Sequence, residues 1–216
     1  MESTEVTKSL NETVLARDYG GLLPAAPGLG ELSIQLLKMP EERLIISHLR
    51  KYADFESEYE LDPGMAAFEK KKDQIGMVMA IFRDALPIAT IRFIPGGHGV
   101  TLTERYWGHL SHGTEILGPN NWEVGRLVMA PENRRADLLP RCLAMSLVEL
   151  LDHAHVESFH ASCLTRTARL YRRFGFTVRG TSTSSGGKEC ALIHAPVESV
   201  ARAFKVPLRP ESAVLQ

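Results

Sequence analysis

The segment from residue 122 to residue 154 constrains the fold most strongly. Trp122 to Ala130 is predicted to be a strand, and Asp137 to Ala154 is predicted to be a helix. The apolar face of this helix repeats at helical spacing and consists of Leu139, Leu143, Ser146, Leu147, Leu150 and Leu151. A strand followed by a helix with one apolar face is typical of a layered α/β domain.

The remaining elements extend this pattern in both directions. A strand at 32–36 precedes a helix that Pro40 opens, and Gly175 is expected to cap the helix at 167–174. Further strands are predicted at 77–82, 88–94, 159–164 and on both sides of the turn at 184–187, and 100–106 is an additional candidate. The order predicts a mixed α/β fold whose sheet begins antiparallel and includes a parallel crossover.

Length and composition indicate one globular domain with extensions. The 216 residues are 44% hydrophobic and 24% charged, as in ordinary globular proteins. Residues 1–31 are polar and then rich in Gly, Pro and Ala, so they are treated as an N-terminal extension. The domain is expected to span residues 32–195, with a C-terminal extension at 196–216.

Charge and hydropathy exclude several function classes. A net charge of -1 gives no general attraction to nucleic acid, and no apolar stretch approaches the roughly 20 residues of a membrane span. Without a basic and then apolar leader, we expect a cytoplasmic protein. Cys142, Cys163 and Cys190 are isolated, and the histidines lack zinc-motif spacing, so no metal is expected. The run Lys70-Lys71-Lys72 is expected to be a solvated face.

Two segments resemble the GNAT superfamily of N-acyltransferases. EVGRLVMAPENRRADLLPRCLAMSLVELL is similar to the strand, turn and long helix of that family, and ARLYRRFGF is similar to its tyrosine and Gly-Phe signature. The resemblance implies a GNAT-like, mostly antiparallel sheet with a parallel splayed strand pair and flanking helices. WEVGRLV and IATIRFIP also resemble acyl-homoserine-lactone synthases and N-acyl amino acid synthases, although Ala89 and Gly125 replace the glycine and serine of that branch.

The resemblance implies an enzyme that moves an acyl group from a thioester to a primary amine of a small molecule or amino acid. The backbones of Leu127 and Met129 would hold the pantetheine arm. The turn formed by Arg134, Arg135, Ala136 and Leu138 would face the phosphates of the donor.

Two departures in this turn bear on the donor. Asp137 and Leu139 stand where the family has glycines, and Asp137 is expected to cap the helix with its carboxylate. The donor is therefore either acyl-CoA or an acyl-phosphopantetheine on acyl carrier protein, since the carrier protein delivers no adenosine diphosphate. Seven arginines either form a docking surface for an acidic carrier protein or are an ordinary solvated face: Arg134, Arg135, Arg141, Arg166, Arg169, Arg172 and Arg173.

Two side chains are candidates for proton transfer. By resemblance, Tyr171 is the general acid at the thioester sulfur, with a core tyrosine as the alternative. Glu123 is either the general base or a salt-bridge partner, and it is expected to lie opposite Arg126, for which a structural or substrate-orienting role is favoured. The acceptor side is expected in the loops at 52–64 and 106–121. The alternative function is a non-catalytic GNAT-like module that binds an acyl carrier or a regulatory partner.

Overall fold

The computed structural model describes residues 31–53, 64–108, 117–184 and 186–208, so all but one residue of the predicted N-terminal extension lies outside it. The elements are β1 (Leu32–Leu36), η1 (Glu42–Ile46), α2 (Ser47–Arg50), α4 (Met65–Ile75), β2 (Met77–Arg83), β3 (Leu86–Pro95), η2 (Thr103–Trp107), β4 (Asn121–Met129), η4 (Pro131–Asn133), α5 (Leu138–His153), β5 (Ser158–Leu164), α6 (Thr165–Tyr171), η5 (Arg172–Phe174), β6 (Thr177–Thr183), β7 (Glu189–Pro196) and α7 (Val197–Phe204).

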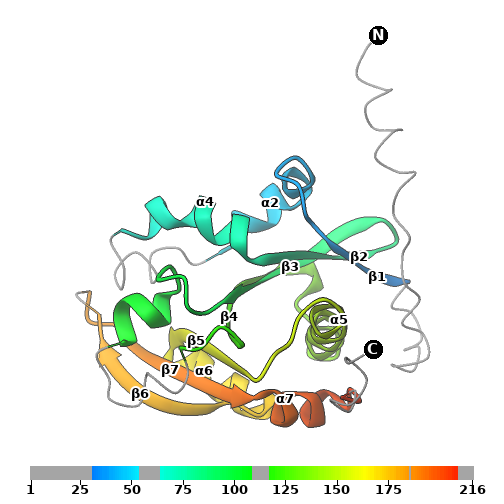
Figure 1. Ribbon diagram of the computed structural model, residues 1–216. Helices are drawn as coiled ribbons and strands as arrows, with labels where there is room; N and C mark the ends of the chain where they lie inside the picture. The colour runs from blue at the N-terminus through cyan, green and yellow to red at the C-terminus, as the bar shows by residue number, and fades with distance from the viewer. Residues whose placement is uncertain (1–30, 54–63, 109–116, 185, 209–216) are drawn as a thin grey trace, which may run out of the picture.

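The strands form a seven-stranded sheet in the order β1-β2-β3-β4-β5-β7-β6. Neighbouring strands are antiparallel except β4 and β5, which α5 connects as a crossover. Helices α2 and α4 cover one face of the sheet, and α5, α6 and α7 lie on the other (Figure 1). The predicted mixed α/β, mostly antiparallel sheet with one parallel pair is confirmed.

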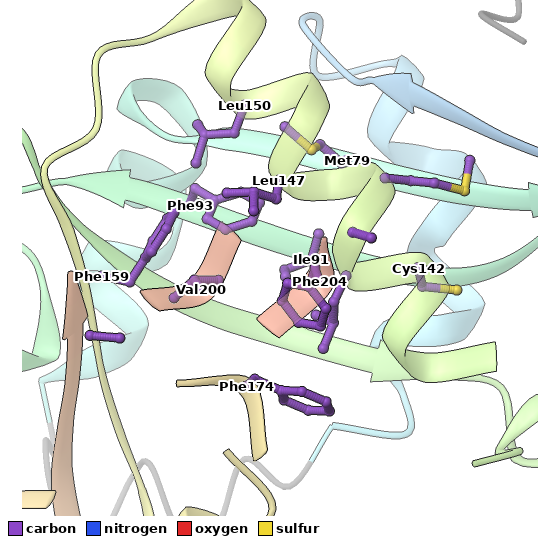
Figure 2. Packing of buried hydrophobic residues seen from close by; sticks show 14 of the residues in the cluster. Met79, Ile91, Phe93, Cys142, Leu147, Leu150, Phe159, Phe174, Val200 and Phe204 are labelled. Carbon is purple, nitrogen blue, oxygen red and sulfur yellow. The ribbon is translucent and has the colours of Figure 1, made fainter. Parts of the chain in front are cut away.

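The main hydrophobic core lies between the sheet and the helices α5 and α7. Ile91 and Phe93 from β3 and Phe159 from β5 face Leu147 of α5 and Phe204 of α7 (Figure 2). The apolar residues of α7 that join this core are Val197, Val200, Ala201 and Phe204. The segment 197–204 therefore packs as an integral layer of the domain.

Three local predictions differ from the structure. Residues 103–106 of the strand candidate at 100–106 belong to the helical turn η2. Glu104 accepts hydrogen bonds from the backbone N–H groups of Gly97, Val100 and Thr101, so the chain turns around its carboxylate. Helix α4 was not predicted, since its sequence is mostly polar. Within it Lys72 is 2% exposed, so the predicted solvated lysine face is wrong for that residue.

Gly175 ends the helical segment of α6 and η5, as predicted. Its φ is +90°, a left-handed conformation that favours glycine. A Cβ at this position would lie 2.8 Å from the carbonyl oxygen of Ser199 on α7. The turn therefore combines a left-handed backbone with a close approach of a second helix, and both place Tyr171 and Phe176 against the core.

We predict that Gly175→Ala lowers the free energy of unfolding by about 2–4 kcal/mol, through backbone strain and the clash with Ser199. The matched control is Gly187→Ala, where φ is +76° but a Cβ meets open space. The control should cost only about 1–2 kcal/mol. Urea unfolding measures both, and equal losses would contradict a role for the contact with α7.

Candidate functional site

Strands β4 and β5 pair over only three residues and then separate. The register joins Asn121 to Ser158, Trp122 to Phe159 and Glu123 to His160. Strand β4 continues to Met129 and β5 to Leu164, yet no further pairs form between them in the described chain. One edge of each strand is thus left without a strand partner beyond this point.

A β-bulge in β4 accompanies the separation. Between the pairs Thr90–Val128 and Arg92–Gly125, β3 advances two residues and β4 advances three. The extra residue bends the strand, and Arg126 takes a φ of +50°, which is uncommon outside glycine. The bulge interrupts the strict alternation of side chains, so Arg126 lines the same polar pocket as Glu123 and Gly125. The prediction that Arg126 lies opposite Glu123 is wrong for this reason.

The backbone of Met129 faces the open edge. Because Ala130 N–H donates to Ile88 of β3 and successive residues of a strand face opposite sides, the polar groups of Met129 point away from β3. Leu127 lies within the bulge, between the pairs that Val128 and Gly125 form with β3. The carbonyl oxygen of Met129 already accepts a hydrogen bond from Arg134 Nε at 3.1 Å. The Met129 carbonyl, which was predicted to bind the pantetheine arm, therefore already has a hydrogen-bond partner within the protein.

An apolar pocket opens on the face of α5, α6 and α7. Its empty space is about 370 Å³, part of it open to solvent. Figure 2 shows much of its wall, which is formed by Ile91, Phe93, Val124, Leu143, Leu147, Phe159, Tyr171, Phe174, Phe176, Val200 and Phe204. Apart from the phenol oxygen of Tyr171, these side chains present only carbon.

Tyr171 lies in this pocket at the end of α6. Its ring packs edge-on against Phe174 and Phe176, with centroids 6.3 Å and 5.6 Å away. Burial raises the pKa of Tyr171, with a smaller contribution from Cys163. The phenol is therefore protonated near neutral pH and available as a hydrogen-bond donor.

A polar pocket opens on the opposite face of the sheet, beneath α4. It encloses about 320 Å³ of empty space, also partly open to solvent, and is lined by Lys72, Arg92, Leu102, Glu123, Val124, Gly125, Arg126 and Ser162. Val124 contributes to both pockets. The split between β4 and β5 therefore lies between an apolar space on one side and a polar space on the other.

Glu69 of α4 holds the two strand arginines of the polar pocket. Arg92 donates to both of its carboxylate oxygens at 3.0 and 3.2 Å, and Arg126 donates at 3.0–3.1 Å. Asp73 also binds Arg92, at 2.7 Å, and Arg50, at 2.6 Å. Burial alone would raise the pKa of Glu69, but Arg92, Arg126 and Lys72 lower it to about 2.

Glu123 is tied to the helical turn η2. Its carboxylate accepts hydrogen bonds from Leu102 N–H at 3.1 Å and from Thr103 N–H and Oγ1 at 2.8 and 3.0 Å. Thr103 Oγ1 also lies 2.8 Å from His160 Nδ1. Burial lowers the pKa of His160, against the opposing charge of Glu123, so the imidazole is neutral. Glu123 thus anchors the wall of the polar pocket while lining it.

The turn before α5 differs from the predicted arrangement. Asp137 makes no side-chain capping hydrogen bond; its carboxylate binds Arg135 instead, at 3.1 and 3.2 Å. The amides of Leu138 and Leu139 bond to the Arg135 carbonyl, and the third helical residue, Pro140, has no N–H. Ala136 is exposed and Leu138 is buried. This helix start offers few free amides for an anion.

The predicted proton-transfer residues lie on different sides of the split, with Tyr171 in the apolar pocket and Glu123 in the polar pocket. Sequence reasoning missed Glu69 and Asp73, because α4 was read as a connection. It also missed Ser162, which is a single small polar residue within β5 and belongs to no motif. Within the described ranges, no three side chains of His, Cys, Asp or Glu gather where they could hold a metal ion. No helix in the described part of the chain is long and apolar enough to cross a bilayer.

We predict that Glu69→Gln lowers the free energy of unfolding by about 3 kcal/mol at pH 7, because Arg92 and Arg126 are almost fully buried and lose their shared anion. The stabilisation by Glu69 exists above its usual pKa of 4.5 and is lost as pH falls toward 2. The difference between wild type and variant in urea unfolding should shrink over that interval. Glu132→Gln, at an exposed glutamate, should change little, and a pH-independent Glu69→Gln effect would refute the charge argument.

Comparisons with known proteins identify the fold of the chain. The sequence matches no protein-family model and no curated protein. Among solved structures, FeeM, an N-acyl amino acid synthase from uncultured soil microbes, is similar at a TM-score of 0.61 and 15% identity, over 81% of this chain and 96% of that one. The AHL synthase LasI gives a TM-score of 0.54 and 13% identity over 84% and 98% of the two chains. BjaI, a CoA-dependent acyl-homoserine lactone synthase solved with SAM and isopentyl-CoA, gives a TM-score of 0.55 and 12% identity over 82% of this chain and 92% of that one. The chain has the fold of the GNAT acyltransferases.

Proposed function

We propose that this protein is an N-acyltransferase that moves an aliphatic acyl group from a thioester to the primary amine of a small molecule, such as an amino acid. The observation that supports this most is the split between β4 and β5, with an apolar pocket on one side, a polar pocket on the other and Val124 between them. A thioester donor and a polar acceptor need such a two-sided site, because each must reach one carbonyl carbon from its own side.

In the proposed reaction, the amine nitrogen attacks the thioester carbonyl carbon, so a C–N bond forms and the C–S bond breaks. Glu123 lies on the acceptor side and takes the amine proton, directly or through water. Tyr171 lies on the donor side. Because burial raises its pKa, Tyr171 acts by donating a hydrogen bond to the developing thiolate. The proton lost by the amine balances the one that the free thiol gains.

The turn before α5 favours acyl carrier protein as the donor over acyl-CoA. A pyrophosphate needs free amides at a helix start, and here Pro140 lacks one, the Arg135 carbonyl takes two, and Asp137 adds negative charge. Phosphopantetheine on a carrier protein brings no pyrophosphate to this turn. The exposed arginines beside the donor side, Arg134, Arg135, Arg166, Arg169, Arg172 and Arg173, supply positive charge for an acidic carrier.

We expect Tyr171→Phe to lower kcat about 10- to 100-fold in an assay of thiol release from decanoyl carrier protein, with L-amino acids as acceptors. The fold should be retained, because the ring contacts with Phe174 and Phe176 persist. Thr177→Val is the control for loss of a hydroxyl group, since the Thr177 hydroxyl donates to the His194 carbonyl outside both pockets and its loss should leave kcat unchanged. Unchanged kcat in Tyr171→Phe would remove its assigned role, and no thiol release with any donor would reject the proposed function.

Charge reversal tests the choice of donor. The double variant Arg166→Glu and Arg169→Glu should raise KM for decanoyl carrier protein at least about tenfold and leave KM for decanoyl-CoA nearly unchanged. Arg202→Glu on α7 is the matched control at an exposed arginine outside the proposed docking surface. A wild type that prefers decanoyl-CoA, or equal effects on both donors, would contradict carrier-protein docking. Preference for acetyl over decanoyl donors would contradict the use of the apolar pocket by the acyl chain.

A further inference from the structure

Gly125 and Ser162 face the mouth of the split from opposite strands. Glu123 of β4 is in register with His160 of β5, and this is the last pair before the strands separate. Side chains two residues apart share a face of a strand, so Gly125 and Ser162 follow on the face of the polar pocket. Both line that pocket. They stand where the next cross-strand contact would have formed.

Ser162 presents an oriented hydroxyl to this space. Its Oγ accepts a hydrogen bond from Trp107 Nε1 at 3.0 Å. An indole N–H only donates, so this contact occupies one oxygen lone pair and leaves the hydroxyl hydrogen and a second lone pair for another partner. Trp107 is 1% exposed and belongs to η2, which Glu123 anchors. The hydroxyl is therefore held by a rigid support and is not itself fully buried.

Gly125 leaves the pocket open beside this hydroxyl. A Cβ built on Gly125 has no heavy atom within 4 Å, and its backbone does not require positive φ. A side chain at position 125 would therefore occupy part of the polar pocket without straining the backbone. A neighbour such as Gly76 differs, because a Cβ there would lie 2.6 Å from a backbone oxygen.

We propose that Ser162 binds and positions the amine acceptor through its hydroxyl group, and that the missing side chain at Gly125 sets the size of acceptor that fits. This inference rests on the proposed acyl transfer for its kinetic test, but it also predicts binding without turnover. The attacking amine can donate an N–H to the free lone pair of Ser162, while the hydroxyl hydrogen binds an oxygen of the acceptor. Trp107 keeps the hydroxyl at the split.

The first test uses binding alone. The chain has two tryptophans, and Trp122 Nε1 donates to the His155 carbonyl at a separate place. In a ¹H–¹⁵N spectrum of the full protein, assigned with Trp107→Phe, we titrate glycine, L-leucine, L-phenylalanine and 2-phenylethylamine. At least one amine should shift the Trp107 indole signal while the Trp122 signal stays, and Ser162→Ala should abolish the shift. If no amine moves the Trp107 signal more than the Trp122 signal, the proposal is overturned, whether or not the enzyme turns over.

The second test separates acceptor binding from support of Trp107. Ser162→Ala should raise KM of the best acceptor about tenfold and leave KM of the acyl donor unchanged. In the wild type, Ser162→Ala leaves the indole N–H of Trp107 without its acceptor. Trp107→Phe removes that N–H, so in the Trp107→Phe background Ser162→Ala leaves no indole donor unpaired. The same KM increase in both backgrounds supports contact with the acceptor. An effect that disappears in the Trp107→Phe background shows a structural role and rejects the proposal.

The third test addresses size. The variants are Gly125→Ala and Gly125→Val. Gly125→Ala should keep the thermal midpoint of the wild type, because its Cβ has no heavy atom within 4 Å. Their KM should increase with acceptor size, about tenfold for L-phenylalanine in Gly125→Val, with glycine affected least. Equal KM changes for all acceptors, or none, would contradict Gly125 as the residue that sets acceptor size.

Discussion

The buried contact between Arg126 and Glu69 links the elements on which the site depends. Arg126 lies in the β4 bulge, and its guanidinium lies 3.0 Å from a carboxylate of α4. Moving a guanidinium out of water without an anion is costly, so the bulge and the position of α4 stabilise each other. The bulge bends β4 where β5 leaves it. A polar helix, a strained backbone and the opening of the sheet are therefore parts of one arrangement.

The two faces of the split differ because different layers cover them. On one face, α5 and α7 contribute apolar side chains, and the pocket there is almost free of polar atoms. On the other face, α4 contributes the Glu69 carboxylate that binds Arg92 and Arg126. There η2 contributes backbone N–H, hydroxyl and indole N–H groups that bind Glu123 and Ser162. This asymmetry makes an aliphatic donor and a polar acceptor chemically compatible with a single opening. Val124 stands at the boundary, which places the reacting carbonyl of the proposed mechanism beside β4.

Two glutamates fix the backbone beside the polar pocket. Glu104 collects the amides of the 97–101 turn, and Glu123 collects those at the start of η2. Each carboxylate thereby accepts hydrogen bonds from backbone N–H groups that would pair with a neighbouring strand if this segment were in the sheet. The proposed catalytic role of Glu123 is compatible with this anchoring, since the residue also lines the polar pocket. The cost is that changes at Glu123 affect both chemistry and structure, so Ser162 and Gly125 are cleaner probes of the acceptor.

Much of the architecture could be predicted from local sequence. The strand patterns of β1 to β3, the apolar face of α5 and the glycine that ends η5 are set by residues close in the chain, so they can be recognised without tertiary information. The two segments that resemble GNAT proteins also placed the split strand and Tyr171. The polar sequence of α4 and the bulge at Arg126 could not be read in this way. Their signal is a set of charge pairs between residues far apart in the chain, Glu69 with Arg126 at a separation of 57 positions and Glu69 with Arg92 at a separation of 23.

The sequence alone therefore determined the sheet with its crossover helix, since hydrophobic periodicity is a local property that forces each element to bury one face. Tertiary structure decided what the site contains. It brought Arg92 and Arg126 onto Glu69, and placed Ser162 across from Gly125 at the mouth of the split. Those contacts depend on how strands separate and helices cover them, and hydrogen bonds between distant residues leave no periodic trace along the chain.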